Sequence, residues 1–297
     1  MWQPDKIFGF AECSSQAKSL AEALGAAYET VDVHRFPDGE SLVRVKERSD
    51  KAALFRSLHQ PNEKLIEVIL AAGALRDRNA AEVVLIAPYL PYMRQDIAFH
   101  PGEAVSQKII GNLLAQHFDR FVSVDPHLHR TKTLGEVFED KPALCLTAAP
   151  AITACIAARR DLENIIVVGP DVESTPLVKA VAGPLNSAWT VATKLRHGDR
   201  EVEIALPHDA KISGRDAIVV DDIISSGATI SILAERLRGG GAASVEVYAT
   251  HALFGDAAQK AMADAGVRQI ISCDSIPHVT NGIALSDVLA EGLRSWL

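Results

Sequence analysis

The C-terminal half of this 297-residue chain alternates between apolar, β-branched runs and segments in which apolar residues recur at helical spacing. Strands that alternate with helices favour parallel sheets covered by helices on both faces. Strands are predicted at residues 120–124, 164–169, 188–193, 216–222, 244–250 and 269–273, and helices at residues 149–159, 174–182, 229–237 and 256–265. The pattern therefore indicates an α/β fold.

The N-terminal half shows the same alternation with shorter strands. Strands are predicted at residues 6–9, 41–46, 52–56 and 82–87, and helices at residues 14–24, 63–76 and 103–117. The chain is long enough for two domains, and Lys141-Pro142 interrupts the pattern between residues 135 and 150. We predict two α/β domains, residues 1–145 and 146–283, with a last helix within residues 284–297 that packs back on the first.

Composition narrows the class of protein. The chain is 48% hydrophobic and 23% charged, which is typical of a soluble globular protein. Its net charge of −8 and the absence of a Lys/Arg-rich block argue against a nucleic-acid partner. No apolar run reaches transmembrane length and no signal pattern is visible, so we expect a cytoplasmic protein without a membrane partner. The four scattered cysteines are expected to be buried free thiols.

Residues 218–229 carry the most specific chemical signal. An apolar run ends in Asp221 and Asp222, and a loop of small residues leads into a helical pattern. Backbone N–H groups at the start of a helix suit a phosphate, and Gly227 permits close approach of an anion. Two carboxylates beside a phosphate site are useful if they bind sugar hydroxyls or a metal ion. The segment predicts recognition of a sugar phosphate, although the Asp pair alone is compatible with a solvated pair before a capped helix.

Two further segments that follow predicted strands carry polar side chains. Arg94 offers a planar fork for phosphate oxygens and Gln95 can bind a base edge, although an isolated Arg-Gln-Asp loop is more often a surface salt-bridge cluster. Asp171 can hold Mg²⁺ or the sugar end of a substrate, or it can cap the helix that follows. His127 and His129 point the same way only if the chain stays extended.

Two segments read as turns between strands. Lys194 and Arg196 alternate, so both can project to one face, and a mobile loop carrying them could close two cations over a transferring phosphoryl group. In isolation, an ordinary charged hairpin is the better explanation of the segment. Residues 36–40 contain Pro-Asp-Gly, a strong turn signal that needs no further function.

Together these segments resemble the ribose-phosphate pyrophosphokinases, which make 5-phosphoribosyl 1-diphosphate (PRPP), and more closely their short, archaeal-like branch. Residues 221–229 resemble the PRPP motif that these enzymes share with type I phosphoribosyltransferases, although Ser226 and Ala228 stand where Thr and Gly are commoner. Tyr92-x-Arg94-Gln95-Asp96 resembles the family's ATP-binding stretch, and Val124-Asp125-x-His127 its histidine motif.

The resemblance implies two tandem phosphoribosyltransferase-like domains, each a mostly parallel sheet flanked by helices. It also implies a role for each group of residues. The catalytic residues would be Lys194 and Arg196; ribose 5-phosphate would be bound by Asp221, Asp222, Ser225, Ser226, Gly227, Ala228 and Thr229; ATP by Phe36, Asp38, Glu40, Arg94, Gln95 and Asp96; and Mg²⁺ by His127 and Asp171. It further implies a homo-oligomer built on a dimer, with the ATP site shared between subunits.

Two alternatives share part of the pattern. A type I phosphoribosyltransferase needs residues 221–229 but not the Arg94-Gln95 segment, and it is usually a single domain. A non-catalytic subunit associated with the synthetase keeps the fold but loses catalytic residues, whereas Lys194, Arg196 and His127 are present here.

Overall fold

The computed structural model describes residues 2–159, 162–197, 201–207 and 210–296, and for residues 194–197 and 201–203 it describes the backbone alone. The chain forms two compact units. Unit 1 comprises residues 1–146, 275–277 and 285–297, and unit 2 comprises residues 147–274 and 278–284.

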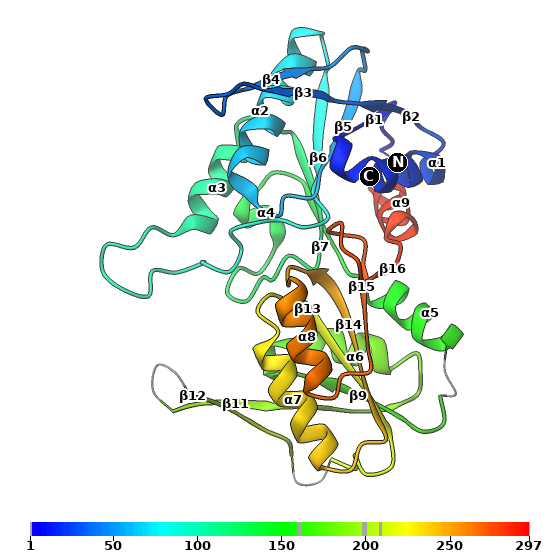
Figure 1. Cartoon of the computed structure of the whole chain (residues 1–297). Helices are drawn as coiled ribbons and strands as arrows, with labels where there is room; N and C mark the ends of the chain where they lie inside the picture. Colours follow the sequence, from blue (N-terminus) through cyan, green and yellow to red (C-terminus); the bar gives the residue numbers. More distant parts are fainter. Residues whose placement is uncertain (1, 160–161, 198–200, 208–209, 297) are drawn as a thin grey trace. The chain divides into compact units, whose positions relative to one another are not determined.

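In the described part of unit 1, six parallel strands form a sheet in the order β2-β1-β5-β6-β7-β8 (Figure 1). The strands are β1 (Lys6–Gly9), β2 (Ala27–Thr30), β5 (Lys51–Phe55), β6 (Glu82–Ile86), β7 (Arg120–Val124) and β8 (Ala143–Leu146). The helices are α1 (Ser14–Leu24), α2 (Pro61–Asp77), α3 (Ser106–Ala115), α4 (Leu134–Val137) and α9 (Ser286–Ser295). Helices α1 and α9 lie on one face of this sheet, and α2 and α3 on the other.

Burial on both faces explains the composition of these strands. The last four residues of β6 are all buried, as expected where helices cover both faces of a parallel sheet. Helix α2 begins with Pro61 at its first turn, where the missing N–H costs nothing. The last helix closes the unit, since Trp2 donates its amide to the Trp296 carbonyl at 2.7 Å and the two rings lie 5.8 Å apart, edge to face.

A separate antiparallel hairpin extends from unit 1. It consists of β3 (Asp32–Arg35) and β4 (Ser41–Arg44), and β4 packs on α2. The turn between them, residues 36–40, is held by the Phe36 amide, which donates to the Glu40 carbonyl at 2.8 Å. The turn predicted from Pro-Asp-Gly is confirmed.

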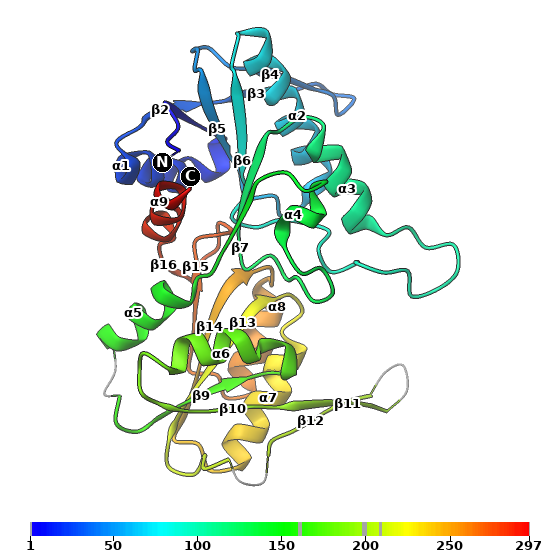
Figure 2. The same cartoon turned by 180° about the vertical axis from the view of Figure 1, so that it is seen from behind.

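In unit 2, the described residues form a second parallel sheet of six strands in the order β10-β9-β13-β14-β15-β16 (Figure 2). Its strands are β9 (Ile165–Gly169), β10 (Ala188–Val191), β13 (Asp216–Ile224), β14 (Ser244–Ala252), β15 (Gln269–Cys273) and β16 (Asn281–Ile283). Its helices are α5 (Ala149–Arg159), α6 (Thr175–Ala182), α7 (Ala228–Gly239) and α8 (Asp256–Asp264). Strands β11 (Thr193–His197) and β12 (Glu201–Ala205) form an antiparallel ribbon.

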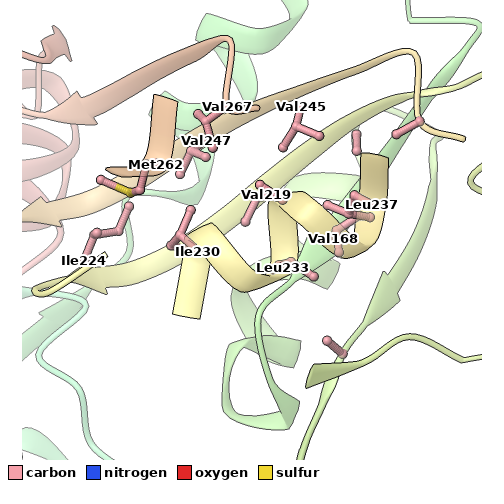
Figure 3. Packing of buried hydrophobic residues seen from close by; sticks show 14 of the residues in the cluster. Val168, Val219, Ile224, Ile230, Leu233, Leu237, Val245, Val247, Met262 and Val267 are labelled. Atoms are coloured by element: carbon pink, nitrogen blue, oxygen red, sulfur yellow. The ribbon is translucent and has the colours of Figure 1, made fainter. Parts of the chain in front are cut away.

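The core of unit 2 lies between this sheet and helices α7 and α8. Ile230, Leu233 and Leu237 recur along one face of α7 and are at most 2% exposed. They pack with sheet residues such as Val219 and with Met262 of α8 (Figure 3). This apolar spacing fixes the rotation of α7, and with it the direction of the loop that precedes the helix.

The predicted α/β architecture of two mostly parallel sheets is confirmed, but several boundaries differ. The helix predicted to start at residue 103 begins at Ser106, because Glu103 uses its carboxylate to accept from the amides of Phe99 and His100. The strand predicted at 216–222 continues through Ile224. The strand predicted at 188–193 divides at Ala192, after which β11 begins.

The structure also bears on the expected burial of the cysteines and on the expected absence of a membrane span. The cysteines are all free, but only Cys13 and Cys273 are buried, whereas Cys155 is half-buried and Cys145 is exposed. The expectation of buried thiols is therefore wrong for Cys145. Among the described residues, no helix has the length and apolar character that a membrane crossing requires.

Candidate functional site

Three predicted carboxylates of unit 2 lie at the carboxyl ends of β9 and β13. Asp171 comes two residues after β9, and Asp221 and Asp222 lie close to the end of β13 at Ile224. The two strands are parallel neighbours in the sheet. Open α/β sheets bind ligands at this edge, so the structure brings these three carboxylates to the place where a ligand is expected.

The loop of residues 225–227 connects β13 to α7. Gly227 has a φ of +72°, in the left-handed region, and stands as the N-cap of α7. A side chain at residue 227 would crowd Met262, because a Cβ there would lie 3.2 Å from the Met262 side chain. Ser225 and Ser226 are exposed, and Ser226 Oγ accepts from the Ala228 amide at 3.4 Å. The exposed loop thus ends at a helix N-terminus, where unpaired amide groups favour an anion.

The remaining loop residues belong to the helix itself. Ala228 is exposed and is the first residue of α7, and Thr229 is half-buried in the first turn. The helix was predicted to begin at residue 229, one position later. Its start at Ala228 places both residues among those whose amides lack a partner within the helix.

Like charges surround Asp221. Burial raises the pKa of Asp221 well above its usual range, and the nearby carboxylates of Asp222 and Asp171 raise it further. The amide of Asp222 donates to Asp221 Oδ1 at 3.0 Å, which offsets only part of this repulsion. A bound cation would relieve it, and three carboxylates are the oxygen donors that Mg²⁺ prefers. By their chemistry alone, these carboxylate oxygens suit a divalent cation.

Asp171 also has a structural role. Its carboxylate accepts from the amides of Glu173 at 3.0 Å and Ser174 at 3.3 Å, and so caps the short 3₁₀ turn η2 (Val172–Ser174). The helix-capping alternative is thus real, and a carboxylate retains lone pairs for a second partner. Gly169 makes this turn possible, because a Cβ there would lie 2.0 Å from Ser174 Oγ.

In unit 1, the Arg94-Gln95-Asp96 segment follows β6 and is anchored to its surroundings. Asp96 pairs with Arg130 at 2.7 Å, and its side chain is 4% exposed. Gln95 Oε1 accepts from Ser106 Oγ at 2.5 Å, at the start of α3. Arg94 is exposed. The salt-bridge interpretation therefore holds for Asp96, while Arg94 is the member of the segment that presents its side chain to solvent.

His127 and His129 come together after β7. Asp125 and His127 both have positive φ, at +39° and +54°, so the chain does not remain extended. The two imidazoles meet edge to face, with their Nε2 atoms 2.6 Å apart. At this distance one of the two nitrogens donates and the other accepts. His127 was singled out because it matches the family's Val-Asp-x-His motif, which includes no counterpart of His129. The contact between the two rings is a consequence of this turn.

Phe36, Asp38 and Glu40 lie on the exposed turn between β3 and β4. Phe36 contacts the His34 ring of the same hairpin, and Asp38 Oδ1 accepts from the Glu40 amide at 3.1 Å. Beneath the hairpin lies a buried network around Glu67 and Arg56 that the sequence argument missed. The sequence signal for this network is Glu67, a charged residue between apolar neighbours in the helix predicted at residues 63–76.

Lys194 and Arg196 lie in β11, which pairs with β12 so that Lys194 is opposite Ile204 and Arg196 opposite Val202. The hairpin predicted as an alternative is present. The side chains of both residues fall outside the described part of the chain, as do residues 198–200. Their catalytic role stays a prediction.

Known proteins match over nearly the full chain. Residues 6–117 match the N-terminal domain of ribose phosphate pyrophosphokinase, and residues 139–287 match the phosphoribosyl transferase domain. A ribose-phosphate pyrophosphokinase of Methanopyrus kandleri is 33% identical, with 94% of each chain covered. Ribose-phosphate pyrophosphokinase 2 of Archaeoglobus fulgidus is 32% identical, over 93% of this chain and 96% of its own.

A solved structure agrees with the sequence matches. The phosphoribosylpyrophosphate synthetase of Mycobacterium smegmatis is 26% identical, covers 98% of this chain and 97% of its own, and superposes with a TM-score of 0.83. The resemblance drawn from the motifs is therefore confirmed across both units, and the chain belongs to the ribose-phosphate pyrophosphokinase family.

Proposed function

We propose that this protein is a ribose-phosphate diphosphokinase, which converts ATP and ribose 5-phosphate into AMP and PRPP. The observation that carries the proposal is the group of three carboxylates beside a glycine-containing loop at the carboxyl ends of β9 and β13. Such a site offers a helix N-terminus to a phosphate and carboxylates to sugar hydroxyls. The full-length similarity to named pyrophosphokinases supports it.

In this proposal the loop of residues 225–229 binds the 5-phosphate, and Asp221 and Asp222 accept hydrogen bonds from the ribose 2- and 3-hydroxyls. Arg94, Gln95 and Asp96 seat ATP from unit 1, while Phe36, Asp38 and Glu40 contact adenine, completing the ATP site of a neighbouring subunit. A homo-oligomer built on a dimer is thus part of the proposal.

The proposed Mg²⁺ ligands are Asp171 and His127. When bound, the ion neutralises charge on the ATP phosphates. Among this chain's own residues, Lys194 and Arg196 would stabilise the charge on the transferred group and on the departing AMP.

The reaction itself is a displacement at phosphorus. The 1-hydroxyl oxygen of ribose 5-phosphate forms a bond to the β-phosphorus of ATP, and the bond from that phosphorus to the α-phosphate oxygen breaks. AMP leaves with the bonding electrons, and the hydroxyl proton is released. Because a diphosphoryl group moves intact, the protein contributes mainly positioning and charge stabilisation.

An assay for AMP tests the proposal directly. Purified protein is incubated with Mg²⁺, ATP and ribose 5-phosphate, and each component is omitted in turn. AMP formed only in the complete mixture, with PRPP as its co-product, is the expected result. Release of diphosphate from PRPP on addition of a base, without AMP formation, would instead establish a phosphoribosyltransferase. A folded protein that binds Mg²⁺-ATP, forms neither product and changes the activity of a synthetase would be an associated subunit.

A further inference from the structure

One buried carboxylate contacts both strands of the β3–β4 hairpin. Glu67 of α2 is 0% exposed and lies beneath the hairpin, since α2 packs on β4. Its Oε1 accepts from Ser41 Oγ at 2.9 Å and from Arg35 Nε at 3.1 Å. The two donors come from the two strands of the hairpin, so one buried group holds both.

The two donors to Glu67 stand at the base of the turn between β3 and β4. Arg35 and Ser41 are opposite each other in the β3–β4 register, and they are the last pair before the turn. The turn that they close is residues 36–40, which carries Phe36, Asp38 and Glu40. Glu67 therefore anchors both ends of this turn at its base.

A buried carboxylate is stable only when its charge is compensated. Arg56 supplies the compensation: its Nη2 lies 2.6 Å from Glu67 Oε2, its Nε donates to Glu12 at 2.8 Å, and its guanidinium stacks on Phe10 at 3.9 Å. Burial alone would raise the pKa of Glu67, but the hydrogen bonds from Arg56, Ser41 and Arg35 and the Arg56 charge outweigh it and lower the pKa. The contacts to Arg56, Ser41 and Arg35 therefore favour the anionic form of Glu67.

The turn itself depends on this anchor. Phe36 is 40% exposed, and its ring contacts His34 of the same hairpin at 4.9 Å. Asp38 is also bonded within the turn, to the Glu40 amide. The direction in which these side chains point is thus set by the base of the hairpin and not by packing on the sheet.

We propose that Glu67 is a positioning residue for ATP, which holds the hairpin so that Phe36, Asp38 and Glu40 meet the adenine ring. This inference rests on the proposed function, because it takes the turn to be the adenine-binding segment. It adds a residue from the interior of unit 1 to the determinants of ATP affinity. Ribose 5-phosphate, which is assigned to unit 2, should not depend on it.

The test combines four variants of the full-length protein. Ser41→Ala removes one hydrogen bond to Glu67, and Ser41→Thr keeps the hydroxyl. Glu67→Gln removes the charge. Glu63→Gln is the matched control, because Glu63 lies one turn earlier on α2 and also pairs with Arg35, at 2.7 Å, but its side chain is 66% exposed.

Two readouts are measured on each variant: the Kd of Mg²⁺-ATP by calorimetry, and amide hydrogen exchange in the peptide that covers residues 35–41. Losing one hydrogen bond to a charged group should weaken ATP binding about tenfold in Ser41→Ala, and more in Glu67→Gln. Exchange at the turn should accelerate in both. Ser41→Thr and Glu63→Gln should resemble the wild type, and the KM for ribose 5-phosphate should be unchanged throughout.

The outcomes separate this inference from the assignment of the reaction. If Ser41→Ala folds and binds ATP as tightly as the wild type, the positioning role is overturned even when the enzyme forms PRPP. If Ser41→Ala weakens ATP binding while the wild type releases no AMP, the positioning role stands and the synthetase assignment fails. A parallel increase in the KM for both substrates would show a general structural effect and would also overturn the proposal.

Discussion

The loop at the end of β13 allows a quantitative test of why a glycine stands at residue 227. Gly227→Ala places a Cβ on a residue whose φ is +72°. The left-handed conformation costs an L-residue about 1–2 kcal/mol, of which the lower entropy of the unfolded chain returns about 0.4–1 kcal/mol. The net cost of backbone conformation is therefore about 1 kcal/mol.

A second cost comes from packing. The added Cβ would lie 3.2 Å from three atoms of Met262, which is 0% exposed and held against the core of unit 2. The Met262 side chain must shift by a few tenths of an ångström to make room, away from its best torsion angles, at about 1 kcal/mol. The two terms sum to about 2 kcal/mol for Gly227→Ala.

Gly214→Ala is the matched control. Gly214 belongs to the same unit and has a φ of +77°, but nothing lies within 4 Å of the position of its Cβ. It carries the conformational cost alone. With a slope of about 2 kcal/mol per molar urea, Gly227→Ala should lower the unfolding midpoint by about 1 M and Gly214→Ala by about 0.5 M.

Urea unfolding followed by circular dichroism measures both shifts. Equal shifts in the two variants would refute the argument about Met262, because only Gly227 faces that side chain. Midpoints at the wild-type value in both would refute the argument from backbone conformation. The comparison is meaningful because both glycines lie in one unit, so separate unfolding of the two units affects the variants equally.

Three further predictions concern charge. Burial and the Lys64 charge lower the pKa of His59 to about 4. As the pH drops from about 6.5 to about 4, only the unfolded chain takes up the proton, so the free energy of unfolding should fall by up to about 3 kcal/mol. Urea titrations at each pH should show a smaller fall for His59→Gln. Arg56→Met should destabilise unit 1 by about 3–5 kcal/mol because it leaves Glu67 uncompensated, and Arg56→Met/Glu67→Met should recover most of this in the same titration. Lys194→Ala should lower kcat about 100-fold or more with little change in KM, as measured by AMP release; an effect on KM alone would remove Lys194 from the catalytic role.

The strands that sequence patterns predicted best are those that both faces of a sheet bury. Strand β7 and strand β15 have the predicted boundaries, because buried parallel strands are near-continuous apolar runs. Strands β2, β3, β8 and β16 were missed. Each has three or four residues and is mostly half-exposed; β2, β3 and β16 are polar in sequence, whereas β8 lies in the segment that was interpreted as the domain boundary. Their pairing is decided by neighbouring strands and not by their own composition, so no local pattern reveals them.

In the site, too, residues that are close in the sequence could be predicted together, whereas contacts that depend on the folded chain could not. Asp221, Asp222 and Gly227 lie within one short segment, and a strand–loop–helix pattern is enough to bring them together. The contact between His127 and His129 depends on two residues with positive φ, which no alternation rule anticipates. Glu67 is harder still, because Ser41 and Arg35 reach it from a hairpin that is distant in the sequence.

The charges around Glu67 and around Asp221 are of opposite sign. This difference distinguishes an internal anchor, Glu67, from a ligand site, Asp221. Glu67 is surrounded by Arg56, Arg35 and a serine hydroxyl, and its pKa is lowered. Asp221 is surrounded by Asp222 and Asp171, and its pKa is raised. The first site is electrostatically complete within unit 1, so an added cation would gain nothing there. At the second site, Asp222 and Asp171 add like charge beside Asp221, and a cation or the hydroxyl donors of a sugar would relieve that repulsion. Substrate recognition is therefore expected at Asp221, whereas Glu67 can affect the reaction only through the hairpin that it holds.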